Sequence, residues 1–181
     1  MNPMDPVVDL TLRAAFGLLF GMAAVHKLRD VDRFRAVLDD YRLLPSGIVP
    51  LASLVVVATE VAIAATLWLA GARRVGFATA GLLLVGYALA MGVNVARGRR
   101  HLDCGCVGAA GREEISWWLV GRNGALALVA FVALRPVGDR ALVWLDGITF
   151  LGALVASAGV YVGIDGLLAN GAGYRRLRGA A

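Results

Sequence analysis

The chain has 181 residues, 59% of them hydrophobic, and a formal net charge of +5. With a mean hydropathy of +0.73, it is too apolar for a soluble globular domain and is typical of an integral membrane protein. The positive charge does not indicate nucleic-acid binding, because the basic residues lie in short loops beside apolar stretches and form no basic face interleaved with aromatic residues.

Five apolar stretches are long enough to cross a hydrocarbon core of about 30 Å as helices of about 20 residues. They cover residues 7–28, 48–70, 75–96, 115–135 and 143–169. Lipid offers no partner to backbone N–H and C=O groups, and none of the stretches alternates as a barrel strand would, so each is expected to be a helix. The predicted fold is therefore an all-α polytopic transmembrane bundle over residues 1–170, with a basic tail at 171–181.

The first stretch is expected to remain in the membrane. No Lys or Arg precedes Arg13, so the stretch lacks the basic region of a cleavable signal peptide. After it, Asp30 is placed to cap a short helix over 31–44, which has one apolar face and one charged face. We expect this helix to lie at the membrane interface, ended by Pro45, and Pro50 to occupy the first turn of the next span.

The loops that alternate between the two sides of the membrane differ in their number of Lys and Arg residues. One set of loops has twelve: Lys27, Arg29, Arg33, Arg35, Arg42, Arg97, Arg99, Arg100, Arg112, Arg175, Arg176 and Arg178. The other set has four: Arg73, Arg74, Arg135 and Arg140. The positive-inside rule then predicts an inner-membrane protein with the connection at 97–114 and the carboxyl terminus on the cytoplasmic side.

The connection at 97–114 contains the only two cysteines, in Cys104-Gly105-Cys106. Two cysteines one residue apart can close a small, strained disulfide ring, and Gly105 permits the backbone angles that closure needs. Strained, exposed disulfides are the reducible ones, so the pair indicates thiol–disulfide exchange. Basic neighbours favour a thiolate and Asp103 opposes it, so the attacking cysteine is not specified. These neighbours are Arg99, Arg100, His101 and Arg112.

Two other interpretations of the cysteines stay open. Reduced cysteines pack as small hydrophobic side chains in many membrane helices, although the polar, Gly-rich setting argues against that here. A metal is the second alternative, since His101 and the two cysteines offer soft ligands. A closed zinc site needs four ligands, which leaves copper(I) on two thiolates, and we predict no metal site.

Ionisable residues inside apolar stretches form a second signal, because they are costly in lipid and usually face the bundle interior. Glu60 lies about 18 Å and Arg122 about 10 Å from the face that bears the cysteine connection, at 1.5 Å per residue. These depths allow a Glu60–Arg122 ion pair, which could equally be a packing device. Together with Asn123, His26 and Lys27, the two residues are predicted to form a polar pocket beneath the cysteines.

A combination of short motifs resembles the MauE/DoxX group of redox-associated membrane proteins over roughly residues 7–135. The motifs are His26-Lys27-Leu28-Arg29-Asp30, Tyr41-Arg42-Leu43-Leu44-Pro45, Glu60, Asp103-Cys104-Gly105-Cys106-Val107-Gly108, Ile115-Ser116-Trp117-Trp118 and Arg122-Asn123. Val107 departs from the aromatic residue usual at that place. The resemblance implies a role in maturing methylamine dehydrogenase, whose small subunit is rich in disulfides, beside an exported thioredoxin-like partner.

The sequence therefore predicts a membrane thiol–disulfide redox protein that uses Cys104 and Cys106 and a thioredoxin-like partner to support disulfide formation or maturation of exported proteins. One cysteine pair provides one exchange site, so a quinone or another subunit of a homo- or hetero-oligomer must supply the other end. Two alternatives remain: a maturation scaffold whose cysteines are dispensable, and a small-solute transporter using the Glu60–Arg122 pocket. Against the transporter, the helices show no internal repeat.

Overall fold

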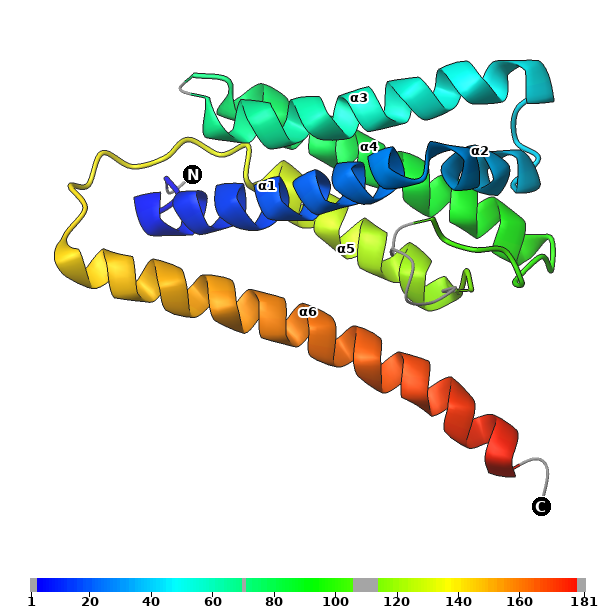
Figure 1. Cartoon of the computed structure of the whole chain (residues 1–181). Coiled ribbons are helices and arrows are strands. Elements are labelled where there is room, and N and C mark those ends of the chain that lie inside the picture. The colour runs from blue at the N-terminus through cyan, green and yellow to red at the C-terminus, as the bar shows by residue number, and fades with distance from the viewer. Residues whose placement is uncertain (1–2, 70, 106–113, 179–181) are drawn as a thin grey trace.

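The computed structural model describes residues 3–69, 71–105 and 114–178, with side chains as far as Gly163 except Tyr161. These residues form helices and connecting loops, and the described part contains no β-strand, which confirms the predicted all-α fold (Figure 1). In chain order the elements are α1 (Pro6–Arg29), α2 (Val31–Asp40), the 3-10 turn η1 (Ser46–Ile48), α3 (Val49–Trp68), α4 (Arg73–Ala96), α5 (Trp117–Val132) and α6 (Trp144–Arg178).

Each predicted span corresponds to one helix. Three described helices, Pro6–Arg29, Ser46–Trp68 and Arg73–Ala96, are long and apolar enough to cross a membrane, while Trp117–Val132 and Trp144–Val160 are shorter apolar helices. The outer surface of the bundle is apolar, with Leu54 and Leu128 each 65% exposed. A surface of this kind is suited to lipid rather than to water. The helix α6 continues to Arg178, well beyond the predicted limit at residue 169 and through most of the basic tail.

Capping residues set the helix boundaries. The carboxylate of Asp5 accepts a hydrogen bond from the Val7 N–H at 2.9 Å at the start of α1, and Asp30 accepts one from the Arg33 N–H at 3.0 Å at the start of α2, as predicted. Pro50 lies in the first turn of α3, also as predicted. The predicted helix over 31–44 is shorter in the structure, because Arg42 adopts a φ of +49° that ends the helical path.

The helices pack in a fixed order that decides which side chains can meet. The helix α3 packs against α1 and α4, α5 packs chiefly against α4, and α6 runs beside α1. Figure 1 also shows that α3 begins beyond the end of α1, above α2. The main apolar core joins α1, α3, α4 and α5, with Phe16 and Phe77 in an edge-to-face contact at 5.8 Å between ring centroids.

A buried ionic contact fastens the end of the bundle where α1 begins. The Asp9 side chain is 9% exposed, and its Oδ1 accepts a hydrogen bond from Nε of Arg73 at 2.5 Å. The same guanidinium donates to the carbonyl of Ala133 and, at 2.9 Å, to that of Arg135. One side chain from α4 therefore holds α1 and the carboxyl end of α5 together.

The connection from α5 to α6 is attached to the amino terminus. Gly138 N–H donates to the Met4 carbonyl at 2.8 Å, and Arg140 binds Asp5 at 3.1 Å and Asp146 at 2.8 Å. The hydrogen bond from Arg140, followed by that from the backbone N–H of Val7, lowers the pKa of the Asp5 carboxyl from its ordinary value. These exposed contacts fix where α6 begins.

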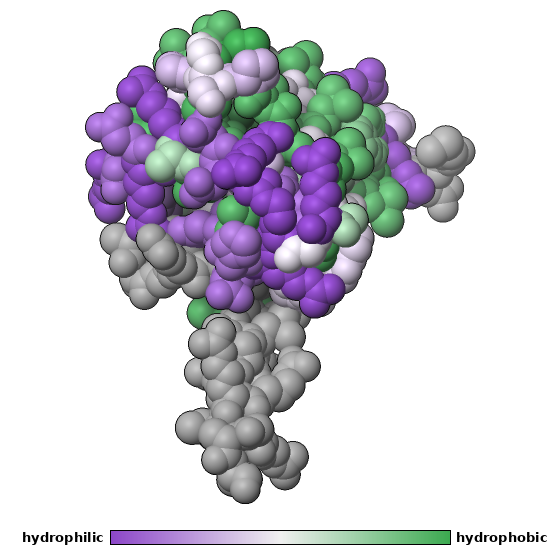
Figure 2. Space-filling model, turned by 90° about the vertical axis from the view of Figure 1, so that its right-hand side faces the viewer, coloured by the Kyte–Doolittle hydropathy of each residue, from purple (hydrophilic) through white to green (hydrophobic). Residues whose placement is uncertain are grey.

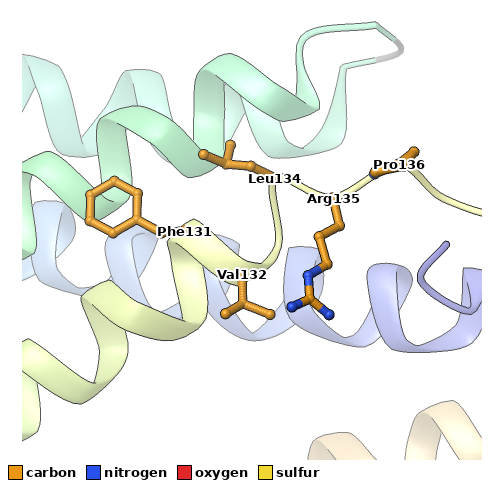
Figure 3. Close-up of a pocket in the computed structure, with 5 residues that line it drawn as sticks. All are labelled: Phe131, Val132, Leu134, Arg135 and Pro136. Carbon is orange, nitrogen blue, oxygen red and sulfur yellow. The ribbon is translucent and has the colours of Figure 1, made fainter. Parts of the chain in front are cut away.

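A shallow, mostly apolar hollow of about 450 Å³ lies at the carboxyl end of α5 (Figure 3). It is lined by Phe131, Val132, Leu134, Arg135 and Pro136. The cysteine connection precedes the amino end of α5, so this hollow lies at the opposite end of that helix and is not part of the predicted site.

Close helix packing predicts different effects for two glycines of α4. A Cβ atom on Gly81 would lie 2.7 Å from Cε1 of Phe131 on α5, whereas one on Gly86 would meet nothing within 4 Å. We expect Gly81→Ala to lower the free energy of unfolding by about 1 to 3 kcal/mol through overpacking. Gly86→Ala should be neutral or stabilising by up to about 1 kcal/mol. Unfolding in mild detergent, followed by circular dichroism, compares the two, and equal effects would contradict this packing.

Candidate functional site

The predicted site residues that the structure describes lie toward one end of the bundle, which we call the cysteine end. It comprises α2, the carboxyl ends of α1 and α4, the amino end of α5 and the described part of the cysteine connection. Figure 2 looks onto this end and shows hydrophilic residues gathered across it, with hydrophobic residues along part of the rim. This distribution is typical of a bundle end that meets water, and the described part of the cysteine connection belongs to this end.

The two chain segments that enter and leave the cysteine connection are held together at its base by backbone hydrogen bonding. Asp103 and Glu114 form an isolated antiparallel bridge, and the Ile115 N–H donates to the Leu102 carbonyl at 3.0 Å. Leu102 and Ile115 are buried beneath this bridge, in an apolar cluster with Tyr41 and residues of α4 and α5. The base of the connection is therefore part of the folded bundle.

Asp103 ties this base to α2 and to the backbone between the cysteines. Its Oδ2 accepts a hydrogen bond from Arg33 at 2.9 Å, and its Oδ1 accepts one from the Gly105 N–H at 3.2 Å. Gly105 has a φ of +68°, the left-handed conformation that glycine adopts at little cost. A Cβ atom there would lie 3.2 Å from Cγ1 of Val37 and 3.8 Å from Cδ2 of Phe34, so the glycine backbone rests on α2.

Cys104 is half-buried and packs at the margin of the apolar cluster that contains Tyr41 and Met91. Cys106, the other predicted redox residue, lies outside the described residues, as does Arg112. Among the residues that the structure describes, no group of three or more His, Cys, Asp or Glu side chains could hold a metal ion.

The basic residues near Cys104 differ in what they contact. Arg99 donates to the carbonyls of Asp40 and Tyr41, at 2.5 Å and 3.2 Å, and to Oδ1 of Asn94 at 2.9 Å. It therefore fixes the end of α2 to the end of α4. Arg100 and His101 are exposed and precede Cys104 by four and three residues, so they remain candidates to favour a thiolate.

Beneath α2 lies a buried polar cluster that we call the Glu60 cluster: Lys27, Glu60 and Tyr87. Glu60 of α3 is fully buried, and its Oε1 accepts hydrogen bonds from Nζ of Lys27 and from the Tyr87 hydroxyl, both at 2.7 Å. The Oε2 atom of Glu60 has no hydrogen-bond partner among the described residues. Phe34 of α2 covers the cluster, with its ring centroid 5.2 Å from Nζ of Lys27.

The predicted Glu60–Arg122 pair is wrong, because the carboxylate of Glu60 pairs with Lys27 instead. Arg122 lies on α5, which packs chiefly against α4, whereas α3 packs against α1 and α4. Asn123 is buried and donates to the Leu119 carbonyl within its own helix at 2.8 Å. His26 is half-buried near the end of α1. Of the five predicted pocket residues, the structure thus joins Glu60 with Lys27 directly.

Two residues of this site were not predicted. Tyr87 lies within an otherwise apolar stretch, where its hydroxyl needs a partner, and this requirement was the available signal. Phe34 belongs to the helix predicted over 31–44, but its position over Lys27 depends on how α2 folds back across α1 and α3.

Comparison with known proteins gives the family. Residues 5–136 match the family model of the methylamine utilisation protein MauE. The chain is 40% identical over 139 residues to the methylamine utilization protein MauE of Methylorubrum extorquens, covering 76% of this chain and 75% of that protein. Its counterpart in Methylophilus methylotrophus is 31% identical over 154 residues, 85% of this chain and 79% of that protein. No solved structure matches. The chain therefore belongs to the MauE family of methylamine utilisation proteins.

Proposed function

We infer that this MauE-family protein is an integral membrane thiol–disulfide redox protein in which Cys104 and Cys106 exchange with a thioredoxin-like partner. The observation that supports it best is the setting of Cys104. The residue lies at the polar end of an apolar bundle, on a connection whose two ends are joined by a backbone bridge. The next residue is a glycine whose positive φ suits a tight disulfide ring. A cysteine serving only as an apolar side chain needs none of these features.

The exchange is balanced in electrons between the two proteins and needs no bound cofactor. A thiolate of the pair attacks a disulfide of the partner and forms a mixed disulfide, and the second cysteine then attacks that bond. The partner leaves as a dithiol and takes up two protons, while Cys104 and Cys106 become a disulfide. Run in reverse, the same steps oxidise the partner, which can then form disulfides in exported proteins needed for methylamine utilisation, methylamine dehydrogenase among them.

A second redox reactant is needed to reset the pair after each turnover. In the oxidising direction the acceptor must take two electrons and two protons and be reachable from the bilayer, which a membrane quinone satisfies by becoming a quinol. A second subunit that carries its own cysteines could equally act as this acceptor. Assaying reoxidation of the reduced protein in lipid vesicles, with and without ubiquinone, separates these routes.

Replacing the cysteines provides the direct test. We expect Cys104→Ser and Cys106→Ser each to abolish complementation of a methylamine-utilising bacterium that lacks its own MauE, while membrane abundance is unchanged, because one thiol cannot complete the exchange. Cys104→Ala is the control for packing, since it keeps a small apolar side chain. Differential alkylation across a graded thiol redox buffer, read by mass spectrometry, should show the parent pair cycling. Full growth of the single variants would favour a maturation scaffold with dispensable cysteines.

The side of the membrane that the cysteines face is a separate prediction. The excess of Lys and Arg in the loops on the side of the cysteine connection supports a cytoplasmic position for it at the inner membrane. A membrane-impermeant maleimide added to intact spheroplasts should therefore leave Cys104 and Cys106 unlabelled until the membrane is opened. Labelling without opening the membrane would reverse the orientation and let the pair meet a periplasmic partner directly. A single cysteine introduced at Gly71, in the opposite loop, serves as the matched control.

A further inference from the structure

We propose that the hollow at the carboxyl end of α5 binds an anionic phospholipid. The phosphate of the lipid pairs with Arg135, and an acyl chain lies against Phe131 and Val132. The site is at the end of the bundle opposite to the cysteines, so the inference concerns a lipid ligand and does not rest on the proposed redox function.

The lining of the hollow is mostly apolar and open to the surface of the bundle. Phe131 and Val132 are 38% and 42% exposed, and Leu134 and Pro136 complete the apolar part of the lining, around a volume of about 450 Å³. A wholly polar ligand would lose its hydration against these side chains without gaining hydrogen bonds. The lining therefore favours a ligand with an apolar part, and acyl chains are the apolar groups that surround a membrane protein.

Arg135 adds a positive charge to this apolar lining. Its side chain is exposed and has no hydrogen-bond or ion-pair partner among the described residues. Figure 3 shows the side chains of Arg135 and Val132 pointing to the same side of the chain. A guanidinium group binds phosphate oxygens through two parallel hydrogen bonds. A ligand that contacts both side chains at once must therefore be amphipathic and negatively charged.

Most other charges at this end of the bundle are already paired. Arg13 and Arg73 bind Asp9, and Arg140 binds Asp5 and Asp146. Asp139 is exposed but is not among the residues that line the hollow. Arg73 also donates a hydrogen bond to the backbone carbonyl of Arg135 at 2.9 Å, so the backbone of the site is held in place before a ligand binds.

The length of α5 puts the hollow at the level of the lipid headgroups. Trp117 and Trp118, at the amino end of α5, are 57% and 42% exposed, and tryptophans of this kind mark a membrane interface. From there the 16 residues of α5 span about 24 Å at 1.5 Å per residue, against a hydrocarbon core of about 30 Å. The chain therefore reaches the opposite boundary in the few residues after Val132, where Arg135 meets the phosphate groups.

Photo-crosslinking in vesicles tests the site. The full chain is reconstituted into phosphatidylcholine vesicles that contain a small fraction of phosphatidylglycerol with a diazirine in one acyl chain. After irradiation, mass spectrometry of chymotryptic peptides locates the crosslinks, which separates this site from lipid bound near the basic residues of the cysteine end. The same diazirine carried by phosphatidylcholine, with identical acyl chains, measures ordinary contact with the bilayer.

Arg135→Gln and Arg74→Gln form a matched pair. Both arginines are exposed, lie at the same end of the bundle and have no described partner for their side chains, but Arg74 does not line the hollow. We expect Arg135→Gln to lower phosphatidylglycerol crosslinking at residues 131–136 severalfold, and Arg74→Gln to leave it unchanged. Arg135→Lys should keep part of the crosslinking, because it keeps the charge and loses the paired hydrogen bonds. The fold should persist in each variant, since Arg73 binds the carbonyl of Arg135 and not its side chain.

Three results would overturn the proposal. Equal crosslinking of the two lipids at residues 131–136 would show only the general contact of a membrane helix with the bilayer. Equal crosslinking in Arg135→Gln and Arg74→Gln would show that Arg135 does not hold the headgroup. Full competition by inorganic phosphate, which has no acyl chain, would assign the site to a free anion. None of these results bears on whether Cys104 and Cys106 exchange disulfides.

Discussion

Removing one member of the Lys27–Glu60 pair is expected to lower the free energy of unfolding by about 3 to 5 kcal/mol, because it leaves a buried charge without its counter-charge. Glu60→Gln should lie at the upper end of that range. Lys27→Met should also fall within that range, because it leaves the buried carboxylate without its counter-charge. The double variant Lys27→Met/Glu60→Leu, which removes both charges, should recover much of the loss. Unfolding in mild detergent, followed by circular dichroism, gives the four values.

The exposed pair of Arg35 and Asp32 is the matched control for this cycle. Their side chains are 46% and 94% exposed, and the charges lie 3.3 Å apart on one helix face. We expect Arg35→Ala to change stability by no more than about 0.5 kcal/mol. If the losses from the two single changes at Lys27 and Glu60 simply added in the double variant, the residues would not be coupled as the structure has them.

The second large effect is expected at the opposite end of the bundle. Arg73→Ala should lower the free energy of unfolding by about 2 to 4 kcal/mol, because it removes charged hydrogen bonds and leaves the Asp9 carboxylate buried. Arg74→Ala is the control, since Arg74 is the next residue in the chain and is exposed. Limited proteolysis of membranes should also cut the connection between α5 and α6 faster in Arg73→Ala, because Arg73 binds the carbonyls of Ala133 and Arg135. Equal stability of the two variants would contradict the contact.

Much of the fold could be predicted from the sequence, because lipid imposes helices on apolar stretches of sufficient length. The five predicted stretches correspond to α1, α3, α4, α5 and α6, and the roles of Asp30 and Pro50 were correct. The predicted ends of two helices, α2 and α6, were less accurate, because local geometry decides where a helix ends. Arg42 ended α2 early with its positive φ, and α6 ran past residue 169 to Arg178.

The partner of Glu60 could not be predicted by counting residues from a common membrane face. That count assumed that all helices begin at one level, but α3 begins beyond the end of α1, so Glu60 lies level with Lys27 rather than deep below it. Helix adjacency then decided the pair, since α3 packs against α1 and not chiefly against α5. Adjacency depends on the fit of side chains such as Phe131 against Gly81, which one sequence does not reveal.

The position of Glu60 also bears on how the chain is assembled during synthesis. The stretch Ser46–Trp68 is the most apolar of the three long helices, and a single central carboxylate costs roughly 3 kcal/mol on insertion scales, so α3 can leave the translocon without help. Lys27, in the last turn of α1, is synthesised before Glu60. The ion pair can therefore form only when the two inserted helices meet in the bilayer. It then stabilises the assembly of the helices and not their insertion.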